Sequence, residues 1–300
     1  MSPFAVVDVL CKKTRGFLRL LEDWYSGVRL DGPILGFWDA FRWHSVAVEN
    51  QIRHYFRKPP RVEPVEVHLL GYEHPILLRP RTSDYWCYRQ VFCELEYSDV
   101  EGIADVKFIL DCGGNAGYAS IYFLHRFPGA TVLAVEPDPE NAAVCQRNLR
   151  PYGARATVLQ GGVWSHCGRL ILVPSDFGLG AKWAMQVREI REDDSEVPTI
   201  PAFDIPSLLR YAGVRNVDIL KIDIERSELP LFKSSPGRWL SCVRNLIIEL
   251  HGEDCSQAFF SALERYEYRL SHRGDLTYCL DLRNPLGDLS AAGSAAESAS

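Results

Sequence analysis

The stretch FILDCGGNAGYAS, residues 108–120, most constrains what this chain of 300 residues can fold into. A short apolar run ends in Asp111, three glycines follow at Gly113, Gly114 and Gly117, and an alanine-rich apolar segment comes next. This order predicts a β-strand, a tight turn and a helix. Glycines allow positive φ and close approach of the backbone, and the first N–H groups of a helix have no partner within it. The stretch therefore predicts a cradle for a nucleotide-type cofactor.

The glycine spacing bears on which cofactor this turn would hold. A dinucleotide fingerprint requires G-x-G-x-x-G, which the turn lacks, and Asp111 would repel a pyrophosphate. Glu136 ends a second apolar strand, in TVLAVEPDPEN, 25 residues after Asp111, and its carboxylate could accept both hydroxyls of a ribose. The two acids and the glycine turn favour S-adenosylmethionine, whose ammonium and sulfonium suit Asp111. A structural βαβ unit with an incidental turn is the alternative.

From residue 107 onward, apolar strands alternate with helical segments, which predicts an α/β fold with a mostly parallel sheet and right-handed crossovers. The expected strands are 107–111, 131–136, 157–161, 218–223, 245–251, 269–272 and 278–282. The expected helices are 117–127, 138–150, 204–212 and 254–265. Between the third and fourth strands, residues 163–201 form an insertion that predicts extra strands or a lid over the active-site edge.

Residues 1–64 precede the α/β pattern and predict a helical N-terminal extension. Two amphipathic helices are expected over 4–25 and 33–58, separated by the loop SGVRLDGP. The stretch KPPRVEP is the expected linker to the main domain, 65–282, which would open with a hairpin about Gly71. We expect the extension to cover the acceptor side of the cofactor pocket.

Two further segments complete the expected domain organisation. Residues 283–300, ending AAGSAAESAS, carry too little apolar surface to fold and predict a disordered tail. The stretch RTSDYWCYRQVFCELEY, residues 81–97, predicts a helix beginning near Tyr85. Asp84 stands where it could cap that helix, and a contact with the amino-acid end of the cofactor is equally open.

Composition narrows the location and the partners of the chain. The formal net charge of −6 gives no overall attraction for nucleic acid, although the first 65 residues carry ten Lys/Arg against seven Asp/Glu. The nine cysteines are scattered, without a C-x-x-C pair, which is typical of reduced core thiols. The chain lacks a long apolar run and a signal-peptide pattern, so a cytoplasmic protein is expected. The N-terminal helices would pack on the main domain or form a homo-oligomer contact, rather than lie on a membrane surface.

Charged residues gather where the predicted strands end, which is where an open α/β sheet binds its ligands. They are Asp111, Glu136, Asp223 and Glu225 in LKIDIERSE, and Glu249 and His251 in IIELHG. Lys221 lies two residues before Asp223, on the same face of its strand. Because a lone charge in an apolar strand is costly, we expect Lys221 to meet a carboxylate.

Methyl transfer from a sulfonium requires a positioned acceptor oxygen and, for a hydroxyl, removal of its proton. His251 is the conventional candidate for the base, with Asp223 or Glu225 as alternatives or as groups that orient the imidazole. A purely structural role for His251 is also open. The acids Asp223, Glu225, Glu228 and Glu249 could instead hold a divalent cation together with His251. No fixed spacing requires that cation, so no metal is predicted.

Several of these stretches, in this order, resemble the FkbM-type methyltransferases, a branch of the class I S-adenosylmethionine-dependent fold. Between about Val65 and Leu282 the matching pieces are TSD followed by QVFCELEY, DCGGNAGYAS, AVEPDPEN, GGVW, VDILKIDIE with Glu228, and IIELHG. The resemblance implies a Rossmann-like three-layer sandwich around a seven-stranded, mostly parallel sheet. It also implies an O-methyltransferase acting on a sugar, a glycan or another small-molecule hydroxyl.

The resemblance further implies roles for individual residues. Cofactor contacts would come from Asp111, Gly113, Asn115, Gly117 and Glu136, with Val163 near the adenine and Asp223 at the methyl end. The family pattern after the fourth strand is similar to D-x-E-G-x-E, whereas this chain has Arg226 at the glycine position. Either Arg226 points into the acceptor pocket and binds an anionic substrate, or the site is altered and activity is reduced or lost.

Two readings from other functional classes stay beside the O-methyltransferase. A nicotinamide dehydrogenase is disfavoured by the glycine spacing and by the lack of a Ser/Tyr/Lys catalytic cluster. A methyltransferase-like binding or scaffold protein, catalytically altered at Arg226, would bind the cofactor without turnover. We expect no nucleic-acid substrate, because no basic stripe with interleaved aromatic residues occurs.

Overall fold

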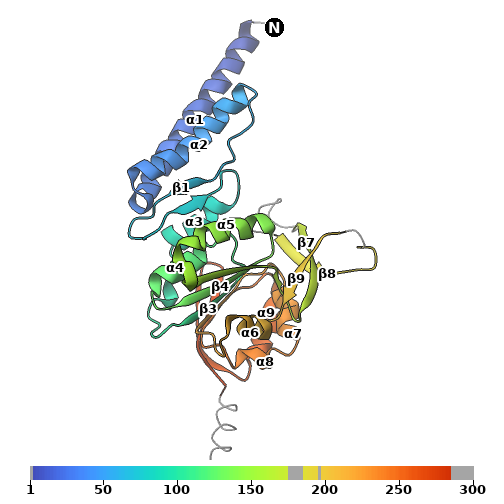
Figure 1. The fold of residues 1–300 in the computed structure, drawn as a ribbon. Helices are drawn as coiled ribbons and strands as arrows, with labels where there is room; N and C mark the ends of the chain where they lie inside the picture. The colour runs from blue at the N-terminus through green and yellow to red at the C-terminus, as the bar shows by residue number, and fades with distance from the viewer. Residues whose placement is uncertain (1–2, 175–184, 195–196, 285–300) are drawn as a thin grey trace, which may run out of the picture. The chain divides into compact units, whose positions relative to one another are not determined.

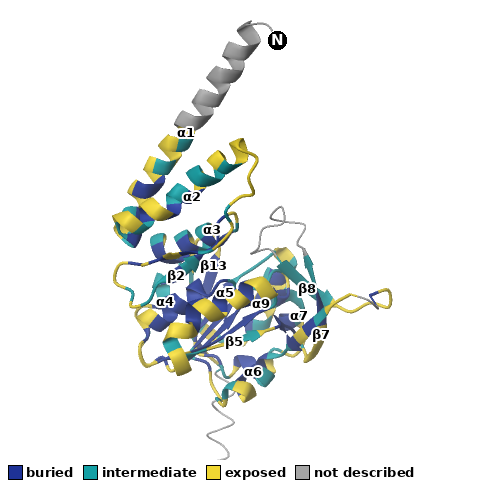
Figure 2. Ribbon diagram, turned by 45° about the horizontal axis from the view of Figure 1, so that its top comes forward, coloured by how far each residue is buried: buried dark blue, intermediate teal, exposed yellow. Residues whose placement is uncertain are grey.

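A computed structural model describes residues 3–174, 185–194 and 197–284 of the chain. By its internal contacts the chain divides into two compact units, Met1–Cys93 and Glu94–Ser300. Figure 1 shows their elements, and Figure 2 shows how far each residue is buried.

Two antiparallel helices form most of the N-terminal unit: α1, Pro3–Leu35, and α2, Phe37–Tyr55. The expected loop over residues 26–33 is wrong, because helix α1 continues through it with Pro33 inside its last turn. The break is confined to Gly36, whose φ of 77° an L-residue rarely adopts. Gly27 lies against α2 so closely that a Cβ atom there would be 2.4 Å from His44 Cε1. That glycine therefore serves helix packing and does not end the helix.

The rest of this unit is a hairpin and a short helix. Strands β1, Val65–Val67, and β2, Ile76–Leu78, pair antiparallel, which confirms the hairpin. Helix α3, Asp84–Tyr88, begins one residue before the expected Tyr85 and continues into the π-helical turn η1, Arg89–Cys93. These elements, which we had assigned to the main domain, fall within the first compact unit.

A seven-stranded sheet is the centre of the second unit. Its strands, in spatial order, are β12 (Glu267–Arg273), β13 (Leu276–Arg283), β11 (Leu246–Glu249), β10 (Ile219–Ile222), β3 (Phe108–Cys112), β4 (Thr131–Glu136) and β5 (Ala156–Gln160). All pairs are parallel except those of β13, which is antiparallel to both neighbours. The expected α/β fold with a mostly parallel seven-stranded sheet is confirmed.

Helices cover both faces of this sheet (Figure 1). Helices α4 (Tyr118–Arg126) and α5 (Pro139–Leu149) contact one face at β3, β4 and β5. The other face packs into a core with α6 (Ile205–Ala212), α7 (Glu228–Lys233), α8 (Gly237–Leu240) and α9 (Glu253–Leu263). Two 3-10 turns, η2 (Ser98–Val100) and η3 (Arg150–Arg155), complete the helical elements of this unit. Since side chains alternate along a strand, Leu110 of β3 faces the core formed with α6 to α9, and the next residue, Asp111, faces α4.

The insertion forms a second sheet beside the first. Its strands, in the order β6 (Gly162–Val163), β9 (Thr199–Phe203), β7 (Gly168–Pro174) and β8 (Met185–Glu189), confirm the expected extra strands. Residues 175–184 and 195–196 of the insertion, and residues 285–300 of the expected disordered tail, lie outside the described residues. Within the described ranges, no helix has the length and apolar character needed to cross a membrane.

Candidate active site

The turn after β3 has two glycines in left-handed conformations. Gly113 has φ of 87°, and Gly117, the N-cap of α4, has φ of 89°. A Cβ atom on Gly113 would lie 1.8 Å from the carbonyl oxygen of Asp223, just beyond β10. A Cβ atom on Gly117 would lie 3.1 Å from the Sγ of Cys145 in α5. The glycines therefore let the turn pack directly against α5 and the chain after β10.

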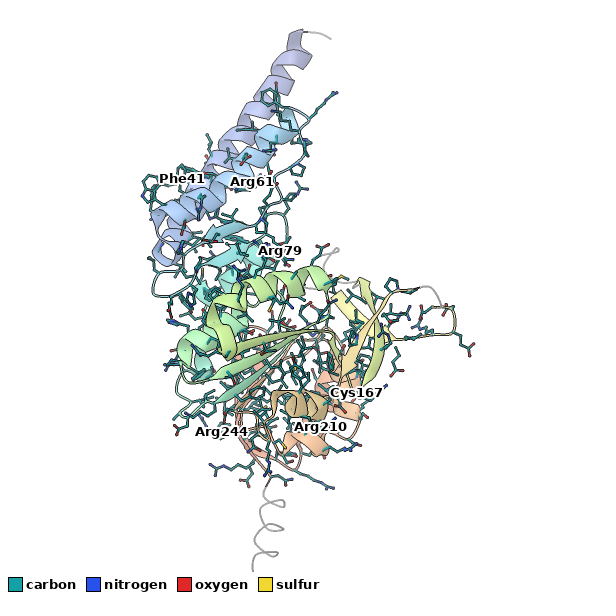
Figure 3. The ribbon with its side chains drawn as sticks, viewed as in Figure 1. Phe41, Arg61, Arg79, Cys167, Arg210 and Arg244 are labelled. Carbon is teal, nitrogen blue, oxygen red and sulfur yellow. The ribbon has the colours of Figure 1, made fainter. Side chains whose placement is uncertain are left out.

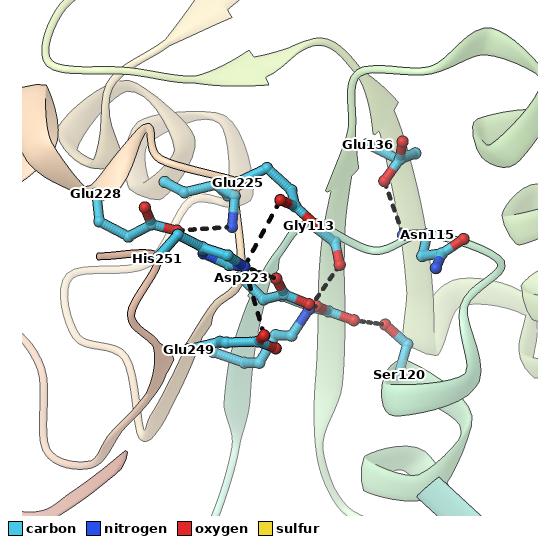
Figure 4. A network of polar contacts seen from close by, with 12 residues as sticks. Gly113, Asn115, Ser120, Glu136, Asp223, Glu225, Glu228, Glu249 and His251 are labelled. Carbon is cyan, nitrogen blue, oxygen red and sulfur yellow. Dashed lines mark hydrogen bonds and ion pairs between the residues drawn. The ribbon is translucent and has the colours of Figure 1, made fainter. Parts of the chain in front are cut away.

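Glu136, at the end of β4, faces this turn (Figure 4). Its Oε2 accepts a hydrogen bond from the N–H of Asn115 at 2.8 Å, and its Oε1 accepts one from the N–H of Asp138 at 2.9 Å. Burial raises the pKa of Glu136 to about 7, although both N–H groups oppose that rise. Oε1 also accepts a bond from Asn141 Nδ2 at 3.5 Å, so the carboxyl group is held in a fixed orientation, and Oε2, with one bond, keeps a lone pair for a ribose hydroxyl.

Asp111 is completely buried between the sheet and α4. Its Oδ2 accepts a hydrogen bond from Ser120 Oγ at 2.6 Å. Its Oδ1 has no hydrogen bond to any described residue, and Lys221 Nζ lies 3.4 Å away. Lys221 therefore compensates the charge of Asp111, and Oδ1 lacks only a hydrogen bond, which an ammonium donor would supply.

Lys221 joins the turn after β3, residues 113–117, which we call the cofactor turn, to the end of β10. Its Nζ donates to the carbonyl oxygen of Gly113 at 2.6 Å and lies 3.4 Å from Asp111 Oδ1 and from Asp223 Oδ2. The expectation that Lys221 meets a carboxylate is confirmed. Burial disfavours the charged amine, but Asp111 and Asp223 outweigh burial and raise the pKa of Lys221 above its usual range. Lys221 is therefore a fixed cation at neutral pH.

Four carboxylates surround His251, and we call these five residues the strand-end cluster (Figure 4). His251 Nδ1 lies 3.0 Å from Glu228 Oε1, and Nε2 lies 3.4 Å from Glu249 Oε1, 3.6 Å from Glu225 Oε2 and 3.9 Å from Asp223 Oδ1. Burial by itself lowers the pKa of His251, but its hydrogen bonds to Glu228 and Glu249 raise that pKa to about 11. At neutral pH the imidazole is protonated, so it donates hydrogen bonds and is unsuited to accept a proton.

Glu225 combines a left-handed backbone conformation with a raised proton affinity. It has φ of 49°, a conformation that costs about 1–3 kcal/mol in a residue other than glycine. Burial raises its pKa to about 7, against the opposing charge of His251 and with a further rise from Asp223. Burial also raises the pKa of Glu249. A carboxyl group with a pKa near 7 can exchange protons at neutral pH, which is what a general base requires.

Arg226 turns toward the loop after β11. Its Nη1 donates to the carbonyl oxygen of His251 at 3.0 Å, and its Nη2 donates to Asp254 Oδ2 at 2.7 Å. A Cβ atom on Gly252 would lie 2.9 Å from that Nη1, so the guanidinium lies directly on this loop. Arg226 has φ of 74°, the left-handed conformation that the family glycine would adopt without strain. The described contacts of Arg226 are therefore contacts with the His251 loop, and its role as a substrate contact stays a prediction.

The remaining predicted site residues occupy different surroundings. Val163 is buried in the core below β4 and α6, and its contact with an adenine stays a prediction. Asp84 belongs to the N-terminal unit, where it is completely buried and accepts three hydrogen bonds from Arg79. The Asp84 side chain makes no capping bond to α3, because the N-cap of that helix is Ser83. The contact of Asp84 with the cofactor stays a prediction.

Sequence reasoning missed Glu96 as a site residue. Its carboxyl group interacts electrostatically with Lys221, Asp223 and Glu249, and burial raises its pKa to about 7. Glu96 lies in QVFCELEY, a stretch that resembles the FkbM-type methyltransferases but in which the sequence indicated no site residue. Ser120 was missed as well, although it is the hydrogen-bond partner of Asp111.

These residues fit S-adenosylmethionine. Asp111 has an acceptor oxygen left for an ammonium, and Glu136 is oriented for ribose hydroxyls. A divalent cation is the other ligand to consider, because Asp223, Glu249 and His251 bring ligand atoms within 4.8 Å of one another. Binding of a cation there would require His251 to lose its ring proton, because a histidine that ligates a metal is neutral.

The part of the chain that contains these site residues is similar to known methyltransferases. A sequence model of the methyltransferase FkbM domain matches residues 111–274. Methyltransferase sdnD of Sordaria araneosa is 28% identical over 189 residues, which cover 54% of this chain and 73% of sdnD. The 2-O-methyltransferase NoeI of Sinorhizobium fredii is 28% identical over 163 residues, which cover 50% of this chain and 63% of NoeI.

Solved structures of similar arrangement are more distant in sequence. Aeropyrum pernix fibrillarin, solved with bound S-adenosyl-L-methionine, is 12% identical, with a TM-score of 0.36 over 62% of this chain and 73% of fibrillarin. TrmK of M. capricolum, solved with S-adenosyl-homocysteine, is 10% identical, with a TM-score of 0.36 over 64% of this chain and 68% of TrmK.

Proposed function

Since the FkbM domain spans more than half of this chain, the chain belongs to the FkbM methyltransferase family, and we propose that it methylates a hydroxyl oxygen. The methyl donor is S-adenosylmethionine. The acceptor would be a hydroxyl on a sugar, a glycan or another small molecule. The observation that carries this proposal is the strand-end cluster, which Lys221 connects to the cofactor turn through Gly113 and Asp223.

The chemistry of the cluster suits a hydroxylated acceptor. Carboxylates accept hydrogen bonds and donate none, so they orient groups that carry a proton, such as hydroxyls. Within the cluster only His251 carries positive charge against four carboxylates, which disfavours an anionic group at the point of transfer. The name of NoeI, a 2-O-methyltransferase, agrees with an oxygen acceptor.

Within this proposal, Glu225 is the general base. S-adenosylmethionine supplies an electrophilic methyl group, whose bond to sulfur breaks as the bond to the acceptor oxygen forms. Glu225 takes the hydroxyl proton, and its raised pKa is close to the pH at which it must do so. His251, 3.6 Å from Glu225, orients and stabilises the carboxylate as a cation. Lys221 and Asp223 fix the end of β10 at the methyl end of the cofactor.

A catalytically altered binding or scaffold protein is the second candidate. The observation that favours it is Arg226, whose guanidinium is bound to the His251 loop at a position where the family has glycine. Such a protein would bind the cofactor normally and transfer no methyl group. Turnover therefore separates the two candidates, whereas cofactor binding does not.

The first experiment is calorimetry of the full chain with S-adenosylhomocysteine. We expect binding in the wild type, its loss in Glu136→Ala, and unchanged binding in the control Glu264→Ala, which removes an exposed carboxylate at the end of α9. The second experiment supplies S-adenosylmethionine with a labelled methyl group to a lysate of the source organism. Label in a small-molecule or glycan fraction that resists nuclease and protease supports the proposal. Cofactor binding without any labelled product would favour the scaffold protein.

A further inference from the structure

The N-terminal unit contains a cavity of about 720 Å³. It lies between α2 and residues 79–86, the segment that leads from β2 into α3; Arg79 on that segment is labelled in Figure 3. This volume is within the usual range of small-molecule sites, roughly 300–1,000 Å³. All its lining residues precede residue 111, so the cavity is separate from the region that matches the FkbM domain.

Aromatic rings form one wall of the cavity. Trp43 stacks on Tyr85 with ring centroids 5.9 Å apart and an interplanar angle of 26°, and Trp86 lies 5.9 Å from Tyr85. Trp86 is 58% exposed, so more than half of its side chain is open to a ligand. Because Trp43 and Tyr85 already stack on each other, the wall offers one apolar side rather than a slot between two rings. A one-sided aromatic wall suits the C–H face of a sugar ring better than a sandwiched base.

A buried carboxylate holds this wall in position. Asp31 is completely buried and accepts hydrogen bonds from the Tyr85 hydroxyl at 2.8 Å and from Arg89 Nη1 at 3.3 Å. Its Oδ2 also lies 2.7 Å from Nε2 of His44, another lining residue. Side chains locked by buried hydrogen bonds provide a preformed binding surface.

The polar part of the lining contains no carboxylate. It contains two arginines, two histidines and the neutral side chains of Asn50, Gln51 and Thr82. Arg79 is neutralised by Asp84, whereas Arg81 is exposed and has no hydrogen bond or ion pair with any described residue. Arg81 also has φ of 64°, a strained conformation that often marks a functional position. Gln51 and His54 add exposed hydrogen-bonding groups on the α2 side.

We propose that this cavity binds an acidic saccharide. The sugar ring would lie against Trp86, and its carboxylate or sulfate would pair with Arg81, while Gln51 and His54 would bind hydroxyls. The binding itself does not depend on methyl transfer.

The test is a titration of the full chain without any methyl donor, and binding is measured by calorimetry and by tryptophan fluorescence. The probe is a chondroitin sulfate tetrasaccharide, with maltotetraose as the neutral comparison and ATP as the nucleotide comparison. We expect saturable binding of the sulfated probe with Kd below about 1 mM, and at least tenfold weaker binding of the other two.

Two variants locate the site. Trp86→Ala and Arg81→Gly should each weaken binding of the probe by roughly tenfold or more. Glycine relieves the positive φ of Arg81, so this variant should fold normally. Arg57→Gly is the matched control, because Arg57 is also an exposed arginine with positive φ, 52°, and does not line the cavity.

Several results would overturn the proposal. They are tighter binding of ATP, equal binding of maltotetraose, absence of binding at millimolar probe, and equal loss of binding in Arg57→Gly and Arg81→Gly. Glu136→Ala distinguishes this proposal from the proposed function: it should lose S-adenosylhomocysteine and keep the tetrasaccharide. Failure of cofactor binding in the wild type would count against methyl transfer, and would leave the tetrasaccharide result to be judged by itself.

Discussion

Replacing Arg226 by glycine would separate the strain at this position from the contacts of its side chain. An L-residue in the left-handed region costs about 1–2 kcal/mol, and Arg226 has φ of 74°. Its ion pair with Asp254 contributes less than about 1 kcal/mol, because the side chains are 41% and 44% exposed. Its hydrogen bond to the His251 carbonyl adds about 0.5–1.5 kcal/mol. Gain and loss nearly cancel, so Arg226→Gly should change the free energy of unfolding by no more than about 1 kcal/mol.

Arg226→Ala is the matched variant, since it loses the same contacts and keeps the strain. After an allowance of about 0.5–1 kcal/mol for the backbone entropy of glycine, Arg226→Gly should be more stable than Arg226→Ala by about 0.5–1 kcal/mol. Urea unfolding of the three proteins measures this difference. Equal stability of the two variants would refute the strain argument.

The same two variants test what the guanidinium does for the reaction. Both free the His251 loop, so we expect kcat for methyl transfer to fall about tenfold in each, with unchanged affinity for S-adenosylhomocysteine. A change of preferred acceptor at undiminished kcat would instead identify Arg226 as a substrate contact. Unchanged kinetics on every acceptor would show that the loop needs no such support.

Three other predictions concern the site. Methyl transfer should increase as the pH rises through about 7, because Glu225 acts as a base only when deprotonated; Glu225→Gln should lower kcat by about 10²-fold and abolish that dependence, whereas an unchanged pH profile would exclude Glu225. Lys221→Met should lower the free energy of unfolding by about 3–5 kcal/mol by leaving the buried carboxylate of Asp111 unpaired, and exposed Lys107→Met should have little effect. Equal denaturation midpoints of the two variants would contradict this. Methyl transfer should persist after treatment with a chelator, because a cation in the cluster would have to displace the ring proton of His251, which Glu228 and Glu249 hold at 3.0 and 3.4 Å. Loss of activity that is restored by Mn²⁺ would show a metal site.

Much of the second unit could be predicted because its signals are local. The apolar run ending in Asp111 and the run ending in Glu136 each form a strand where expected, and the insertion forms strands as expected. The helical conformation of residues 26–33 could not be predicted, because Gly27 is explained only by its contact with α2, which is distant in sequence. Glycine and proline end many helices, but a close helix–helix contact can use the same residues.

The site shows the same division. The sequence predicted that charged residues gather at these strand ends, and the structure brings them together, whereas their chemical roles stay predictions. The charge of His251 could not be predicted, since it depends on four carboxylates that meet only in the folded chain. The contact of Gly113 with the cofactor stays a prediction, but the structure gives a separate reason for a glycine there. Its neighbour is the carbonyl oxygen of Asp223, a contact between the turn after β3 and the chain after β10 that no local pattern encodes. Glu96 was missed because its partners come from β10 and β11, more than one hundred residues later.

The contact between Gly113 and Asp223 has a consequence for how the two ligands are bound. The cofactor turn and the start of the strand-end cluster share this backbone contact and the Lys221 hydrogen bond, so neither segment can shift without moving the other. We therefore expect donor and acceptor to bind with a coupling free energy. If the bound cofactor increases the affinity for the acceptor by some factor, the bound acceptor must increase the affinity for the cofactor by the same factor. Each 1.4 kcal/mol of coupling free energy corresponds to a change of about tenfold in affinity.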